Sequence, residues 1–273
     1  MRPFINSKFR FAVNGGEYLR LYPEGRPLIF AGNHRSHLDA LVLMNAVLPP
    51  YGSRGYLASI APAKTMEENP LFSFTRLLGT FPLDRSNPQL ALDYFYESLR
   101  AGLGLFIFPQ GGRVSRTPIQ DYQSFTREGR TGVGRLVLRM NGEAPVIPFY
   151  IHGSYEALGQ GRMMPRFGAY VSVTFGEPLL FDKYRHKTGW QRNDEFYSTA
   201  RVITDEIMKK VQILLYNNEK PLFEFLEKRF GRPIDDISLS RRQEREVKRL
   251  TRMLASLTPS QTEAVLKKHI KRT

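Results

Sequence analysis

Residues 27–40 read PLIFAGNHRSHLDA, an apolar run that ends in a polar turn. The apolar part, Pro27–Gly32, has the character of a buried strand, because a strand covered on both faces is apolar throughout. Ser36 predicts a helix N-cap and Asp39 completes a variant of the capping box. The expected helix covers 38–47 and ends before two prolines. The polar turn therefore lies at the carboxyl end of a strand, where α/β folds usually carry functional residues.

Segments of strand and helix character alternate through the first two thirds of the chain. Further strands are expected at 54–58, 79–85, 103–108, 145–151 and 170–175. Helices are expected at 71–78, 88–101 and 131–140, and the polar stretch 114–129 is expected to be a loop. This alternation predicts an α/β fold in which a largely parallel mixed sheet is flanked by helices on both faces.

The first 13 residues mix aromatic and basic side chains and leave two interpretations open. Phe9, Phe11 and Val13 alternate as in an ordinary strand, which favours a strand over 9–13. The same segment could instead lie in a membrane interface, with its aromatic rings in lipid and its cations at the headgroups.

The composition changes after Asp182, where helical patterns replace the alternation. One long helix is expected at 193–216, and separate helices are expected at 221–230, 240–257 and 259–270. The stretch 241–249, RRQEREVKR, is strongly charged and mostly basic. We therefore expect two parts: an α/β domain over 1–218 and a basic, helical C-terminal appendage over 219–273.

The net charge of +14 and the absence of cysteine limit the kinds of function that the protein can have. A chain without cysteine has no disulfide, thiol nucleophile or thiolate metal site. The positive charge indicates an anionic partner such as nucleic acid, an acidic membrane face or an acidic protein. The N-terminus lacks the long apolar core of a signal peptide, and no window reaches the roughly 20 apolar residues of a spanning helix. If the protein meets a membrane, we expect it to lie on the surface.

His34 and Asp39 are the candidate catalytic pair. Five residues of ideal helix turn through about 500°, so the two side chains would not meet if both were helical. They can meet if His34 lies in the turn and Asp39 in the first helical turn, an arrangement that an N-cap at Ser36 allows. Asp39 could then fix the tautomer of His34 and leave its other nitrogen as a base. The alternative is that Asp39 only caps the helix and His34 is solvated.

A metal site is not expected in this turn. His34 and His37 are three residues apart, but the sequence holds no second cluster of histidine and carboxylate to complete a ligand set.

Four stretches in order carry a resemblance to a known family. The stretch 33–39, NHRSHLD, resembles the His-x4-Asp motif of the glycerolipid acyltransferases of the lysophosphatidic-acid (1-acylglycerol-3-phosphate) type. Residues 79–85 resemble the second block of that family, the stretch FPQGGR at 108–113 resembles its third block, and Val146-Ile147-Pro148 resembles its fourth. The resemblance covers roughly residues 25–180.

The resemblance implies a reaction and roles. His34 is expected to be the general base, oriented by Asp39, that activates an acceptor hydroxyl for attack on an acyl thioester. The resemblance implies acceptor binding by Arg85 and Arg113, whose guanidinium groups suit a phosphate, and by Gln110, Gly111 and Gly112 of the third block. No resident cofactor is implied, since acyl-CoA or acyl-carrier protein is a co-substrate. The apolar helices at 71–78 and 90–99 are candidates for an acyl groove.

Two residues depart from the family pattern, with Gln110 in place of glutamate and Gly112 in place of threonine. The acceptor is therefore expected among glycerol phosphate, lysophospholipids and other lipid alcohols. A catalytically weak lipid-binding or scaffold relative is the alternative. The expected partners are an anionic membrane surface, the thioester donor and the lysolipid acceptor, with no nucleic acid, because no nucleic-acid-binding motif accompanies the charge. We expect a cytoplasmic protein of phospholipid biosynthesis, peripherally associated with the membrane.

Overall fold

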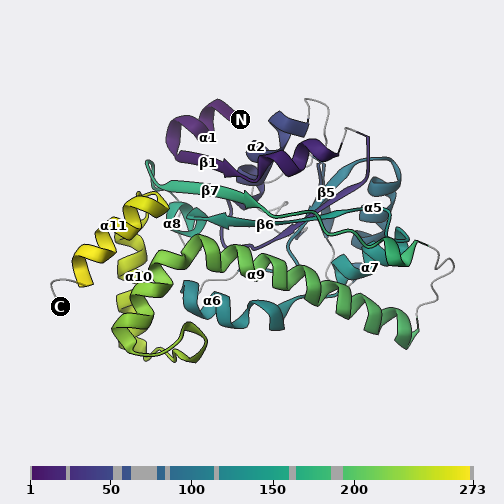
Figure 1. Ribbon diagram of the computed structural model, residues 1–273. Helices are drawn as coiled ribbons and strands as arrows, with labels where there is room; N and C mark the ends of the chain where they lie inside the picture. Colours follow the sequence, from purple (N-terminus) through teal and green to yellow (C-terminus); the bar gives the residue numbers. More distant parts are fainter. Residues whose placement is uncertain are drawn as a thin grey trace.

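The computed structural model of the chain describes residues 2–22, 25–51, 57–62, 79–83, 87–113, 117–159, 164–185 and 193–270. Elements carry the labels of Figure 1. The strands are β1 (Arg10–Asn14), β2 (Leu28–Gly32), β3 (Leu57–Pro62), β4 (Thr80–Leu83), β5 (Gly104–Ile107), β6 (Val146–His152) and β7 (Tyr170–Phe175). The α-helices are α1 (Arg2–Lys8), α2 (Asp39–Tyr51), α5 (Pro88–Arg100), α6 (Pro118–Ser124), α7 (Gly132–Arg139), α8 (Ser154–Leu158), α9 (Asp194–Phe230), α10 (Arg241–Leu254) and α11 (Pro259–Ile270). Short 3-10 helices are η1 (Gly16–Leu21), η3 (Phe125–Glu128), η4 (Asp182–Tyr184) and η5 (Ile234–Asp236).

The seven strands form one sheet in the order β1-β7-β6-β2-β5-β3-β4. Every neighbouring pair is parallel except β6 and β7, which are antiparallel. Helices cover both faces, as Figure 1 shows for α1 and α2 above the sheet and for α9 across its front. The predicted α/β fold, with its largely parallel mixed sheet and helical C-terminal region, is confirmed.

Strand β2 lies at the centre of the sheet, and this position explains why its sequence is apolar. Leu28 and Phe30 pack into the core cluster that holds α1, η1 and α2. Ile29 and Ala31 pack into the opposite cluster, with α5, α7 and the first half of α9. Because successive side chains of a strand point to opposite faces, a strand buried on both faces needs an apolar residue at every position.

Most predicted strands and helices are present, with shifts of a few residues. The strand expected at 9–13 is β1, so the first interpretation of the N-terminus is confirmed for that segment, and α1 precedes it. The strand expected at 54–58 begins at Leu57, and the part of it at 54–56 lies outside the described residues. The helix expected at 71–78 also lies outside them.

Three predictions of secondary structure were wrong. Helix α2 continues through Pro49 and Pro50 to Tyr51, although each proline lacks the N–H that would bond the carbonyl four residues earlier. The loop expected at 114–129 contains α6 and η3 within its described part. Thr117 starts α6 with a complete capping box to Gln120.

The third error concerns the C-terminal half. Helix α9 runs unbroken from Asp194 to Phe230 with Pro221 in its interior, where a break between two helices was expected. The residues after the proline stay helical because Leu222, Phe223, Phe225 and Leu226 are buried in a third core cluster with α6, α10 and α11. The boundary expected between 218 and 219 therefore falls inside one helix, while the division into two domains stays a prediction.

Candidate active site

The turn between β2 and α2 brings the candidate pair together. His34 Nδ1 lies 2.8 Å from Asp39 Oδ2. Asp39 is the first residue of α2 and is fully buried, whereas about a quarter of the His34 side chain is exposed. A carboxylate can only accept, so Nδ1 carries the proton and donates to Asp39. His34 Nε2 is then the nitrogen with a lone pair, which is the arrangement that a general base needs.

Main-chain amides hold Asp39 in this position. The N–H groups of Arg35 and Ser36 donate to Asp39 Oδ2 over 2.6 and 2.8 Å. Ser36 Oγ accepts the N–H of Leu38 at 3.1 Å and donates to the carbonyl of Leu158 at 2.6 Å. The predicted capping box is therefore present in a shifted form, with Leu38 as the amide that the serine caps. Asp39 both accepts main-chain amides at the start of the helix and contacts His34, so the alternative in which it only caps the helix is wrong.

Neighbouring strands hold the turn and the His34 ring. The amide of Asn33 exchanges two hydrogen bonds with the main chain of Ile151 on β6, at 2.9 and 2.7 Å. Phe108, just past the end of β5, stacks on the His34 ring with 4.2 Å between centroids and 9° between planes. Because β2 is parallel to both β5 and β6, the segments after their carboxyl ends meet at one edge of the sheet.

Gln110 links the turn between β2 and α2 to a buried carboxylate. Its Oε1 accepts the main-chain N–H of His34 at 3.4 Å, and its Nε2 donates to Asp121 Oδ1 at 3.3 Å. Asp121, on α6, is fully buried. A glutamate at position 110 would set two carboxylates against each other in a buried site, and like charges at such a distance disfavour ionisation of both. Gln110, which departs from the family pattern, is therefore compatible with the buried carboxylate of Asp121, because its amide can donate a hydrogen bond to it.

The glycines and the arginine of the third block lie beside the same turn. Gly111 has φ +72°, and a Cβ there would meet the Arg130 side chain at 2.4 Å, so glycine suits the position. Its N–H donates to the Phe108 carbonyl at 2.9 Å. Gly112 faces open space. The Arg113 guanidinium contacts the His37 ring, and burial followed by the charge of Arg113 lowers the pKa of His37.

Two sequence expectations about substrate binding have different outcomes. Arg85 lies outside the described residues, so its position beside the site stays a prediction. In α5, Leu92, Phe95 and Leu99 are buried in the core against the sheet, which assigns this part of the expected acyl groove to packing. In the described parts of the chain, no group of three or more histidine, cysteine or carboxylate side chains is placed to hold a metal ion.

Arg35 is a residue that the sequence reasoning did not single out. Its N–H binds Asp39, while its side chain turns away into the protein and is only 3% exposed. Its Nε lies 3.8 Å from Asp121 Oδ2, and its guanidinium lies 5.3 Å from the centre of the Tyr155 ring. Burial lowers the pKa of Arg35, but the charges of Glu156 and Asp121 outweigh it and the net shift is upward. The cation is therefore fixed within the turn, and only tertiary contacts could have indicated it.

A second histidine–carboxylate pair lies where β6 meets α9. His152 Nδ1 is 2.7 Å from Glu219 Oε1, which also accepts the Tyr150 hydroxyl at 3.0 Å. Burial opposes both charges, yet Glu219 raises the pKa of His152 and His152 lowers the pKa of Glu219. This pair is therefore an ion pair that joins the sheet to the long helix.

The comparison with protein families matches residues 10–152 to the family described as Acyltransferase. That span holds β1 to β6, the His34–Asp39 turn and the block at 108–113.

Curated relatives agree with this match. A probable 1-acyl-sn-glycerol-3-phosphate acyltransferase of Mycoplasma pneumoniae is 29% identical over 184 residues, which cover 61% of this chain and 63% of the relative. The corresponding protein of Mycoplasma genitalium is 24% identical over 58% of this chain and 56% of its own length. A glycerol-3-phosphate acyltransferase of Pseudomonas putida is 27% identical over 67% of this chain but only 25% of its own length. The matches thus span about 60% of the Mycoplasma relatives and a quarter of the Pseudomonas protein.

Proposed function

The chain belongs to the acyltransferase family, and on that premise we propose that it transfers a fatty acyl group from a thioester to the hydroxyl of a glycerol-phosphate-derived or lysophospholipid acceptor. The observation that carries the proposal is the 2.8 Å contact between His34 Nδ1 and Asp39 Oδ2 inside the region that matches the family. The names of the relatives support an acceptor built on glycerol phosphate.

The proposed reaction uses His34 as a general base. Its Nε2 takes the proton from the acceptor hydroxyl while the hydroxyl oxygen attacks the thioester carbonyl. The tetrahedral intermediate collapses, the carbon–sulfur bond breaks, and the thiolate receives the proton from the imidazolium. The products are an ester and a free thiol, so no acyl-enzyme is needed. Asp39 keeps the imidazole in the reactive tautomer and stabilises its protonated form.

Acceptor binding is proposed for the third block and for Arg85. Arg113 is half-buried beside His37, and the lowered pKa of His37 keeps that ring neutral beside the guanidinium at neutral pH. A guanidinium so placed can contact two oxygens of one phosphate. In this proposal Gln110, Gly111 and Gly112 shape the wall around the acceptor.

A membrane surface is the proposed source of the lipid substrates. Met164 and Phe167 are exposed before β7, and Met253 is exposed on α10. Cations surround them: Lys8 Nζ lies 5.4 Å from the centre of the Phe167 ring, and Arg166 donates to the carbonyl of Arg252. Exposed apolar side chains framed by cations suit an anionic bilayer, where each cation contributes about 1 kcal/mol. In the described residues, no helix is long and apolar enough to cross a bilayer.

Vesicle binding tests this surface with a matched control. Phe167→Asp should weaken sedimentation with vesicles that contain phosphatidylglycerol about tenfold. Val202→Asp, which changes an equally exposed apolar residue on α9, should not. Equal binding by the two variants would place the lipid contact elsewhere.

The reaction itself is tested by measuring thiol release from acyl-CoA or acyl-carrier protein in the presence of glycerol 3-phosphate, a panel of lysophospholipids and simple lipid alcohols. The wild type should consume the thioester only with an acceptor, and His34→Ala should lower the rate by about 10²–10⁴-fold. Turnover that survives His34→Ala would refute the assignment of the base. Lipid binding by the wild type with no turnover on any acceptor would favour a lipid-binding relative, the alternative that the departures at Gln110 and Gly112 raise.

A further inference from the structure

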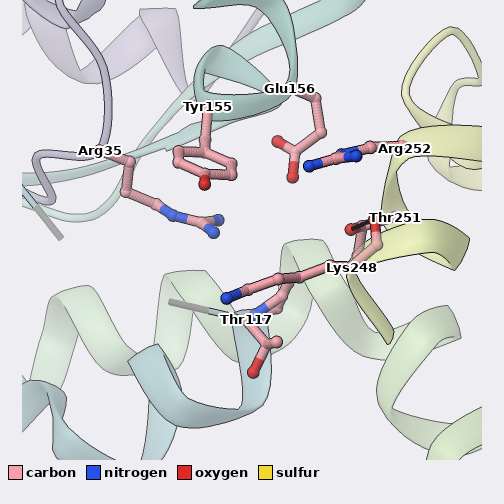
Figure 2. Close-up of a pocket in the computed structure, with 8 residues that line it drawn as sticks. Arg35, Thr117, Tyr155, Glu156, Lys248, Thr251 and Arg252 are labelled. Carbon is pink, nitrogen blue, oxygen red and sulfur yellow. Dashed lines mark hydrogen bonds between the residues drawn. The ribbon is translucent and has the colours of Figure 1, made fainter. Parts of the chain in front are cut away.

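A pocket lies beside the turn between β2 and α2, and Arg35 of that turn is one of its lining residues. Figure 2 shows its walls: Arg35 from the turn, Thr117 from the start of α6, Tyr155 and Glu156 from α8, and Lys248 and Arg252 from α10. Its empty space is about 310 Å³, part of it open to solvent. These walls combine a region that matches the family with a C-terminal helix that does not.

Cations dominate the polar lining. Arg35 and Lys248 extend from opposite sides toward the same space, and Arg252 points toward the carboxylate of Glu156 (Figure 2). Lys248 Nζ also bonds Glu244 Oε1, one helical turn earlier, at 2.6 Å. Along α10 six lysine and arginine residues stand against two glutamates. The wall facing Arg35 is therefore positive, although Glu156 and Glu244 offset part of the charge.

An anion between two cations that converge on a partly buried space adds to the compensation that Asp121 gives Arg35 and Glu244 gives Lys248. Arg35 cannot withdraw to solvent, because its side chain is packed beneath the turn and beside the Tyr155 ring. The Tyr155 hydroxyl points into the same space and can donate a hydrogen bond to an anion, whereas the Thr117 hydroxyl already donates to Gln120 Oε1 at 3.0 Å. A guanidinium, an ammonium and one hydroxyl donor around the same space match the oxygens of a phosphate group.

We propose that this pocket binds a phosphate group between Arg35 and Lys248, with Arg252 at its rim. The site is separate from Gln110 and Arg113, to which the acceptor is assigned above. The phosphate belongs either to the thioester donor, since coenzyme A carries phosphate groups, or to free inorganic phosphate. The donor source rests on the proposed function, whereas phosphate binding itself does not. An occupant would also stabilise the turn that holds Asp39, because Arg35 contributes to both.

Titration of the full-length protein with inorganic phosphate and with coenzyme A, each at constant ionic strength, tests the site. Lys248→Ala should weaken binding of inorganic phosphate about tenfold, and Arg252→Gln about threefold. Lys267→Ala is the matched control: it too removes a lysine bonded to a glutamate four residues earlier on a C-terminal helix, but away from the pocket. It should bind phosphate as the wild type does. Circular dichroism confirms that each variant is folded.

Kinetics then identify the source of the phosphate. A KM for acyl-CoA that rises about tenfold in Lys248→Ala, with kcat unchanged, identifies the donor. An unchanged KM together with weaker binding of inorganic phosphate identifies the free ion. The proposal is overturned if the wild type shows no saturable phosphate binding, or if Lys248→Ala and Lys267→Ala bind phosphate equally. Phosphate binding by a wild type that lacks turnover would refute the proposed reaction and leave this site standing.

Discussion

The two histidine–carboxylate pairs are nearly identical in distance and exposure but differ in how their carboxylates are held. His34–Asp39 spans 2.8 Å and His152–Glu219 spans 2.7 Å, and both histidine side chains are 23% exposed. Asp39 accepts two main-chain amides besides His34, at the start of a helix. Glu219 accepts only the Tyr150 hydroxyl besides His152 among the hydrogen bonds of the described residues.

This difference indicates that Asp39 serves to orient the His34 ring, whereas Glu219 serves to pair its charge with His152. Main-chain amides and a helix N-terminus stabilise an anionic carboxylate without any cation, so Asp39 is free to act on the tautomer of His34. Glu219 lies in the middle turns of α9, away from either end of the helix. His152 and Glu219 stabilise each other's charge. The same two residue types therefore make a candidate catalytic pair at one place and a structural ion pair at another.

Exchanging the carboxylate for an amide should give the largest contrast. Asp39→Asn can keep an amide oxygen toward the three donors that Asp39 Oδ2 accepts, but it removes the carboxylate charge that stabilises the protonated ring of His34, so we expect the transfer rate to fall at least about 100-fold. Glu219→Gln should leave the rate within about threefold of the wild type. Initial rates at saturating donor, below the melting temperature of both variants, measure this. Equal losses in the two variants would remove the distinction between the pairs.

The glutamine that supports the first pair should be coupled to the carboxylate on α6. Gln110→Glu places a charge against Asp121, and we expect a loss of about 1–3 kcal/mol in unfolding free energy and about tenfold in rate. Adding Asp121→Asn should restore most of both, since an amide can again face a carboxylate. Urea denaturation and rates of the two single variants and the double variant complete the cycle. Strictly additive effects would show that the two residues do not interact.

The His152–Glu219 pair should make the stability of the protein depend on pH. The pKa of His152 is raised above its ordinary 6.5, so its contribution is fully present below that value and is lost as the pH rises through the raised pKa. The pKa of Glu219 is lowered from 4.5, so its contribution is present above 4.5 and is lost as the pH falls through the lowered pKa. The stability advantage of the wild type over Glu219→Gln should therefore be largest between these limits. An advantage that does not change between pH 5 and 9 would contradict the ion pair.

The smallest effect is expected at Tyr150. Tyr150→Phe removes the hydroxyl that donates to Glu219, and we expect the unfolding free energy to fall by about 1 kcal/mol with no change in transfer rate. Thermal unfolding and the rate assay measure the two quantities. A loss of rate with unchanged stability would connect this pair to the reaction.

The sequence allowed prediction of what local pattern and family resemblance determine. The strand before His34, the cap at Ser36 and the neighbouring block at 108–113 each follow from short segments, and the parallel sheet then brings them to one edge. Helix α6 was missed because its cap at Thr117 lies within a polar stretch. The continuity of α9 was missed because burial of Phe223 and its neighbours outweighs the local effect of Pro221.

Partners distant in sequence could not be predicted in this way. Asp121 lies 11 residues from Gln110 in a segment expected to be a loop, and nothing local marks it as a contact. Arg35 stands inside the motif, but its packing depends on α6, α8 and α10, whose placement follows from the tertiary fold. The pocket beside Arg35 could not be predicted from the sequence for the same reason.

The most direct test of the catalytic pair is a crossover between His34→Gln and His152→Gln, with transfer rate and unfolding free energy measured for both. If His34 is the base and His152 is structural, His34→Gln loses at least about 100-fold in rate with a modest change in stability, and His152→Gln loses stability while its folded form keeps the wild-type rate. A His34→Gln variant that retains the wild-type rate, or a His152→Gln variant that is stable but inactive, would contradict this assignment.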